Sequence, residues 1–118
     1  MSESYKNLDL WKKAVALACD IYKLSSKFPK EELFGLTSQL RRSSVSISAN
    51  VAEGSGRGSK KDYCRFVDIS IGSLNETESL LFIANELGYL PVYNFKKIQD
   101  NMVELGKLLG GFRKYLIK

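Results

Sequence analysis

The residues best suited to chemistry surround a glycine-rich segment in the middle of the chain. Residues 54–59 read Gly-Ser-Gly-Arg-Gly-Ser, and four basic residues lie within or just after them: Arg57, Lys60, Lys61 and Arg65. A helix that begins after such a segment presents free amide groups beside these cations, and this combination favours anions such as phosphate. The spacing therefore indicates a candidate phosphate contact.

Two interpretations of this segment remain open. In the more common one it is a solvated turn, in which Ser59 and Asp62 form a capping box for the next helix. In the other, the cations of this segment contact the phosphate backbone of a nucleic acid. Arg41, Lys12 and Lys13 are weaker candidates for the same contact. A nucleotide-binding P-loop is not predicted, because the GxxxxGK[ST] order is absent.

A second polar group follows helical spacing. Gln39, Arg42, Asn50 and Glu53 lie three or four residues apart, with Ser46 between them, and so share one stripe of a helix. We predict a structural network in which Arg42 pairs with Glu53 or with another buried acidic residue. Charged groups near an interface are retained when they are paired.

Several classes of chemistry lack the residues that they require. Histidine is absent from the 118 residues, which removes Ser-His-Asp and Cys-His nucleophiles and the commonest metal ligand. A di-iron bundle site needs Glu-x-x-His, so the acidic residues do not supply one. Cys19 and Cys64 follow no CxxC spacing and are expected to be free thiols. We expect no catalytic activity, no metal and no cofactor.

Length and charge narrow the class of protein further. A chain of 118 residues with 44% hydrophobic residues fits one domain, covering residues 1–118, with one core. The net charge is +5. Residues 1–65 hold 12 basic and 7 acidic residues, whereas residues 66–118 hold equal numbers of basic and acidic residues and have no net charge. No stretch approaches the roughly 20 apolar residues of a membrane span, and the N-terminus lacks the apolar region of a signal peptide. We expect a cytoplasmic protein.

Four helices must position these residues. Apolar periodicity and the positions of glycine and proline predict helices at about 10–27, 37–53, 60–87 and 92–116. Asp9 or Asn7 is expected to cap the first, and Gly54 to end the second. Gly88 is expected to end the third. The predicted fold is all-α, an up-down antiparallel four-helix bundle.

Apolar residues on the second and third helices occupy more than one face. Val45, Ala49 and Ala52 lie roughly opposite the main apolar face of the second helix, and Ile69 and others form a second face on the third. A helix with two apolar faces has two partners, which predicts self-association.

Two further expectations concern packing in the interior. The aromatic residues Trp11, Tyr22, Tyr63 and Phe66 are expected to be core residues. The glycines at 106, 110 and 111 are expected to mark close approach of a neighbouring helix.

Long runs of the chain also resemble a known family. DLWKKAVAL, LTSQLRRSSVSISANVAEGSGR and GSLNETESLL are similar to the four-helix bundle proteins encoded in intervening sequences of bacterial 23S ribosomal RNA genes. The resemblance is strong from Asp9 to about Leu90 and covers the last helix by pattern, and Ser48 stands where the family would have proline. The accessory variability protein of diversity-generating retroelements is related.

The resemblance implies a homopentameric barrel that is basic on the outside and has no catalytic activity, with relatives associated with nucleic acid or a reverse transcriptase. Together with the residues, it predicts a non-enzymatic homo-oligomer that binds RNA or DNA through phosphate contacts with low sequence specificity. The alternative is a protein-interaction scaffold or accessory subunit whose basic surface docks a partner, such as a nucleic-acid-bound polymerase.

Overall fold

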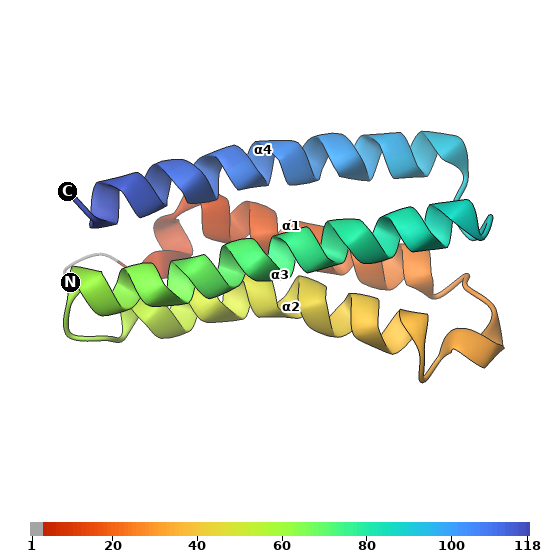
Figure 1. Cartoon of the computed structure of the whole chain (residues 1–118), viewed down its shortest axis with the longest axis horizontal. Coiled ribbons are helices and arrows are strands. Elements are labelled where there is room, and N and C mark those ends of the chain that lie inside the picture. The colour runs from red at the N-terminus through yellow and green to blue at the C-terminus, as the bar shows by residue number, and fades with distance from the viewer. Residues whose placement is uncertain (1–3) are drawn as a thin grey trace.

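The computed structural model describes residues 4–118 and contains four long helices (Figure 1). They are α1 (Asp9–Ser25), α2 (Leu36–Ser55), α3 (Lys60–Glu86) and α4 (Val92–Leu116). Short 3-10 turns, η1 (Tyr5–Asn7) and η2 (Lys30–Glu32), precede α1 and α2. No strand occurs in this part of the chain, which confirms the all-α prediction.

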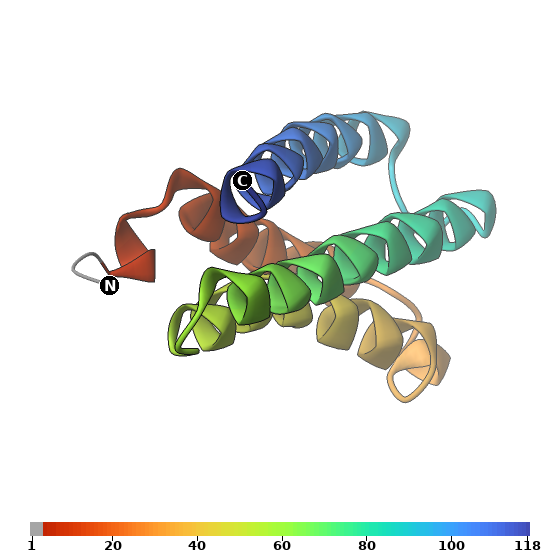
Figure 2. The same cartoon turned by 60° about the vertical axis from the view of Figure 1, so that its left-hand side comes forward.

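Successive helices run in opposite directions along a molecule of 44 × 25 × 20 Å. Each helix packs against the next one, and α4 also contacts α1, so the four close into a bundle (Figure 2). The start of α1 and the end of α4 lie at the same end of the bundle as the turn between α2 and α3. No helix within residues 4–118 is long and apolar enough to cross a membrane.

The start of α1 differs from the predicted one. Leu8 occupies the cap position without a side-chain hydrogen bond, and Asp9 is already the first residue of the helix. Asn7 belongs to η1, whose own cap is the Ser4 hydroxyl, which accepts from the Lys6 amide at 3.2 Å. The prediction that Asp9 or Asn7 caps α1 is therefore wrong, because Asn7 belongs to the preceding 3-10 turn and Asp9 already lies inside the helix.

The end of α2 also differs, for a reason that lies in the packing. Gly54 is buried inside the helix, and Gly56 occupies the C-cap position. A Cβ at residue 54 would lie 2.7 Å from Cδ1 of Tyr63 and 2.8 Å from Cβ of Phe66. Gly54 is thus a point where α2 and α3 approach closely, and not the helix end that we predicted.

The end of α3 follows the prediction. Gly88 has a φ of +78°, a conformation that glycine adopts without the strain of a Cβ. The amide of the next residue, Tyr89, donates to the Ala84 carbonyl at 2.9 Å, and this bond closes the last turn of the helix.

The core follows the predicted helical stripes on α3 and α4. On α3, spacings of four and three residues predict one buried stripe, and all seven of its members are buried: Tyr63, Val67, Ser70, Leu74, Thr77, Leu81 and Ala84. The corresponding stripe on α4 has five buried members, Ile98, Met102, Leu105, Leu109 and Leu116, and two half-buried ones, Phe95 and Phe112. The fully buried large side chains are Ile21, Leu40, Ile47, Leu81, Met102, Leu105 and Leu109. Burial of these side chains supplies most of the driving force for folding.

Small hydroxyl residues join α2 to α3 inside this interior. The hydroxyls of Ser43 and Thr77 lie 2.8 Å apart, and the Ser70 hydroxyl donates to the Ile47 carbonyl at 2.9 Å. Each of these buried hydroxyls has a hydrogen-bond partner, so its burial between the closely packed helices leaves no polar group unpaired.

The glycines of α4 are less constrained than predicted. A Cβ at Gly106 would lie 3.5 Å from Cδ2 of Leu74, which is ordinary contact. At Gly110 and Gly111 it would meet no atom of a neighbouring helix within 4 Å, so the prediction of close approach is wrong at these two positions.

The second apolar faces of α2 and α3 are largely open to solvent in the single chain. Val45 is 41% exposed, and Ile69 and Ile83 are 50% and 46% exposed. The second partner predicted for these helices is therefore not another described segment of the same chain, and the homopentameric barrel stays a prediction.

Candidate nucleic-acid interface

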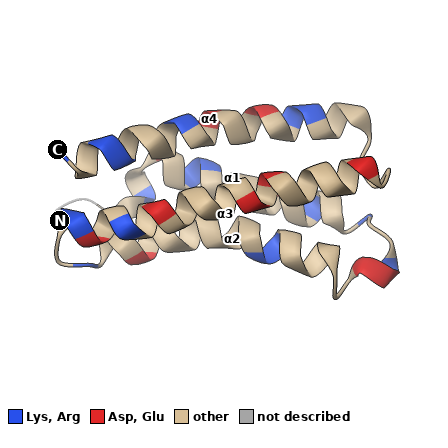
Figure 3. Ribbon diagram, viewed as in Figure 1, with Lys and Arg blue, Asp and Glu red and all other residues tan. Residues whose placement is uncertain are grey.

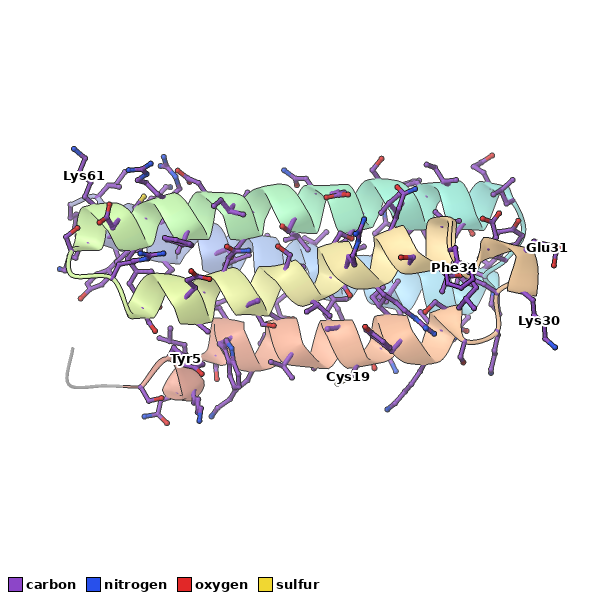
Figure 4. The ribbon with its side chains drawn as sticks, turned by 90° about the horizontal axis from the view of Figure 1, so that it is seen from below. Tyr5, Cys19, Lys30, Glu31, Phe34 and Lys61 are labelled. Carbon is purple, nitrogen blue, oxygen red and sulfur yellow. The ribbon has the colours of Figure 1, made fainter. Side chains whose placement is uncertain are left out.

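The candidate site lies at the end of the bundle where α2 turns into α3 and α4 terminates. Lys61, at the start of α3, projects from this end, opposite the end that carries Lys30 and Phe34 (Figure 4). The last turn of α4 joins the site, because Nζ of Lys60 lies 4.6 Å from the ring centroid of Tyr115.

We call the six basic residues of this region the basic end. Figure 3 shows the corresponding blue segments at the start of α3 and the end of α4. The basic end consists of Arg57, Lys60, Lys61, Arg65, Arg113 and Lys114.

The local backbone forms the predicted cap. Ser59 has extended dihedral angles, and its hydroxyl accepts a hydrogen bond from the Asp62 amide at 3.1 Å. The turn before it is held by the Arg57 amide, which donates to the Gly54 carbonyl at 3.1 Å. These bonds fix the direction in which α3 begins, and they hold the basic side chains on one rigid scaffold.

Three acidic residues of the region each pair with one arginine. Glu53 lies 3.1 Å from Arg57 and Asp62 lies 3.8 Å from Arg65, measured between carboxylate oxygen and guanidinium nitrogen. The third pair joins Arg113 of α4 to Asp68 of α3. The hydrogen bond to this carboxylate raises the pKa of Arg113, so the guanidinium stays charged.

Lysines therefore carry the unneutralised charge of the basic end. Lys60, Lys61 and Lys114 are exposed, and none forms an ion pair with an acidic residue in the described part of the chain. A solvated ammonium group that has no carboxylate partner is available to a phosphate.

Aromatic rings accompany these cations. The Arg57 guanidinium lies 4.7 Å from the Phe66 ring centroid, and the Tyr115 ring is nearly parallel to that of Phe112, at 18° and 6.1 Å. A depression of about 340 Å³ is lined by Arg57, Asp62, Arg65, Phe66 and Ile69. Phe66 was expected in the core but is only half-buried, with one face beneath Arg57.

Sequence reasoning missed the contribution of α4. Arg113, Lys114 and Tyr115 are about fifty positions from the glycine-rich turn, and only the antiparallel packing of α3 and α4 brings them to it. The available signal was the predicted end of the last helix near residue 116, which an antiparallel bundle places beside the start of the third.

The structure places Arg41 elsewhere. Its Nε donates to the Ser25 hydroxyl at 2.8 Å, its Nη2 donates to the Tyr22 carbonyl at 3.3 Å, and its guanidinium lies 4.7 Å from the Tyr22 ring centroid. Arg41 thus closes the C-terminus of α1, where a cation is favoured. It lies about 20 Å along α2 from the turn.

Tyr22, whose ring lies beneath the Arg41 guanidinium, was predicted to be a core residue, and this prediction is wrong. Its side chain is 46% exposed, because it points toward α2 at the surface.

The predicted polar network does not form as one unit. Glu53 pairs with Arg57 instead of Arg42, because eleven positions of one helix separate Arg42 from Glu53 by about 16 Å. Asn50 donates from Nδ2 to the carbonyl and hydroxyl oxygens of Ser46, both at 2.8 Å.

Arg42 and Gln39 face a groove between α2 and α3. Both side chains are exposed, and with Glu76 of α3 they line a cavity of about 440 Å³ that also contains serine hydroxyls. These two residues therefore lie apart from both Asn50 and the basic end.

The α1 lysines differ from each other. Nζ of Lys13 lies 2.9 Å from Oε1 of Glu104, and this hydrogen bond raises the pKa of the ammonium group. Lys12 is exposed. Lys13 is thus engaged within the bundle, and Lys12 is the better candidate of the two for an external contact.

Metal-ligating side chains do not gather in the described structure. Within residues 4–118, no group of three or more Cys, Asp or Glu residues could hold a metal ion. Cys19 is exposed and Cys64 is buried, and both are free thiols.

Comparison with known proteins agrees with this architecture. A crystal structure of a protein of unknown function from the S23 ribosomal protein family of Bacteroides thetaiotaomicron superposes with a TM-score of 0.82 at 27% identity, covering 89% of this chain and 95% of that one. No curated protein matches the chain. The family model described as 23S rRNA-intervening sequence protein matches residues 6–111. The chain therefore belongs to the 23S rRNA-intervening sequence protein family.

Proposed function

We propose that this protein is a non-enzymatic, homo-oligomeric helical bundle that binds RNA or DNA through its basic end. The observation that carries the proposal is the set of three exposed lysines that have no acidic partner in the described structure, Lys60, Lys61 and Lys114. The acidic residues around them are already occupied by arginines. A polyanion therefore meets an uncompensated positive surface.

Binding of this kind depends on phosphate groups. Lysines that reach phosphates release condensed counterions, so the affinity falls as the salt concentration rises and depends little on base sequence. One copy offers few such contacts. Self-association through the exposed apolar faces of α2 and α3 would repeat the basic end, and several weak contacts would then act together.

A charge reversal with a matched control tests the proposal. We expect Lys60→Glu combined with Lys61→Glu to lower the affinity for both structured RNA and duplex DNA, and to flatten its salt dependence. Lys96→Glu combined with Lys97→Glu makes the same change in charge on exposed lysines at the opposite end of α4. Equal losses in the two double variants, or an affinity that does not depend on salt, would contradict the proposal.

Phe34 favours a second candidate function, docking of a partner protein. Its side chain is 92% exposed in the connection between α1 and α2, next to Leu33, which is 48% exposed. An exposed aromatic residue of this kind is typical of an interaction anchor. A partner that survives nuclease treatment in a pull-down and is lost in Phe34→Ala supports this function, whereas loss on nuclease treatment supports nucleic-acid binding.

A further inference from the structure

We infer that the basic end recognises unpaired bases as well as phosphates, so that its preferred ligand is a single-stranded nucleic acid. This inference rests on the proposed function and names the ligand class of the same site. The inference rests on aromatic rings that lie beside the lysines and arginines of the basic end.

The first stacking surface is Tyr115, near the end of α4. Its side chain is 55% exposed, and its inner neighbour is the nearly parallel ring of Phe112. Phe112 in turn packs edge-on against Tyr63, which is only 2% exposed, with 5.2 Å between ring centroids. Three rings in contact therefore lead from the core to the surface, and Tyr115 is the outermost.

The position of Lys60 indicates how Tyr115 would bind a nucleotide. Its ammonium group lies over the Tyr115 ring at 4.6 Å, at the end of a flexible side chain. A base that stacks on Tyr115 takes this place, and the displaced ammonium group remains within reach of the phosphate attached to the same nucleotide. The ring and the cation thus serve two parts of one ligand.

The second stacking surface is Phe66, beneath Arg57. The guanidinium lies 4.7 Å from the ring centroid, and both line the depression that Asp62, Arg65 and the half-exposed Ile69 complete. Arginine planes and phenylalanine rings both stack on bases. The basic end therefore combines two aromatic surfaces with cations for the intervening backbone.

This combination distinguishes single strands from duplexes. In a duplex the faces of the bases are stacked on one another, so an aromatic side chain at the surface gains nothing from them. A single strand exposes these faces, and each stacked base contributes to affinity with little dependence on its identity. Phosphate contacts alone would favour the duplex, which has the higher charge density.

The test compares strands and variants by fluorescence anisotropy on the full chain. The probes are oligo-dT and oligo-U of about 16 nucleotides, together with a DNA duplex and an RNA duplex of the same length. The two single strands distinguish DNA from RNA as the source of the ligand. We expect the single strands to bind more tightly than the duplexes at equal salt.

Substitution of the outer ring separates stacking from charge. Tyr115→Ala should lower the affinity for single strands by about fivefold or more and leave duplex affinity nearly unchanged, whereas Tyr115→Phe should retain single-strand affinity. Tyr93→Ala is the matched control, since Tyr93 is 76% exposed at the other end of α4. Circular dichroism establishes that each variant is folded.

The outcomes separate the two proposals. Duplexes that bind as tightly as single strands, or a Tyr115→Ala variant that loses affinity for both ligands equally, would overturn the inference and leave the proposed function standing. Binding to none of the four probes would overturn the proposed function itself.

Discussion

At the scale of single residues, the role of a side chain depends on the groups that it contacts more than on its charge or residue type. Arg41 and Arg57 are both basic and both cover an aromatic ring, yet Arg41 closes the end of α1 and Arg57 lies within the α2–α3 turn. Gly54 is the clearest case, because its missing side chain makes room for Tyr63 and Phe66.

Gly54→Ala should therefore destabilise the fold. The added Cβ would sit within 2.8 Å of two side-chain atoms of α3, so the helices must separate, at a cost of about 1–3 kcal/mol in the free energy of unfolding. Gly111→Ala is the matched control, because a Cβ there meets no atom of a neighbouring helix within 4 Å, and it should stabilise the fold by about 1 kcal/mol. Urea denaturation measures both, and equal effects would contradict the close approach.

Tyr63 gives a prediction about pH. Its hydroxyl is buried without a hydrogen-bond partner in the described residues, and burial raises the pKa of the phenol above its usual value of 10.0. The folded state therefore keeps its proton where the unfolded chain releases it, so stability should fall as the pH rises above 10.

Tyr63→Phe should reduce this fall. It should also leave stability at neutral pH unchanged or higher, because it removes an unsatisfied polar group. Denaturation at neutral and alkaline pH tests both effects, with the exposed Tyr93→Phe as the control. A variant that is less stable at neutral pH, with the same alkaline slope, would show that the hydroxyl has a partner.

At the scale of elements, helical periodicity was informative and helix ends were less so. The stripe of α3 from Tyr63 to Ala84 is buried as predicted, because one period places its members on one side of the helix. The predicted end of α2 was wrong. A glycine commonly ends a helix, but α2 continues past Gly54, which packs closely against α3.

The candidate site shows the same division between local and tertiary signals. The glycine-rich turn and its serine cap were visible in the sequence, since both are local. Tyr115 and Lys114 were not, since they reach the turn only through the packing of α4 beside α3. The second apolar faces were also visible in the sequence, because helical spacing alone places Val45 and Ile69 away from the main apolar faces of their helices.

The cap of α3 supplies a prediction at this scale. Ser59→Ala removes the hydroxyl that accepts from the Asp62 amide, which should lower the free energy of unfolding by about 1 kcal/mol. Ser79→Ala is the control, because it lies exposed within α3, where alanine is the better helix former. Thermal unfolding compares the two, and a Ser59→Ala variant as stable as Ser79→Ala would show that the cap contributes little.

At the scale of the whole molecule, the charge and the exposed apolar residues are linked. The single chain leaves Val45 of α2 and Ile69 of α3 open to water, although the same helices are fully packed on their inner faces. Exposed apolar surface of this kind favours association, and association would place several basic ends on one particle. Oligomer formation and nucleic-acid affinity should therefore change together.

Val45→Glu and Ile69→Glu, made separately, test this link. Each places a charge on a second apolar face, so light scattering should show a shift from an oligomer toward the monomer mass of 13.3 kDa. Affinity for nucleic acid should fall in Val45→Glu even though this residue lies outside the basic end, because fewer copies then bind one strand. Val103→Glu is the control, because Val103 of α4 is 49% exposed and lies on neither second apolar face. A wild-type chain that is already monomeric at micromolar concentration would remove self-association from the proposal, and the basic end would then have to act singly.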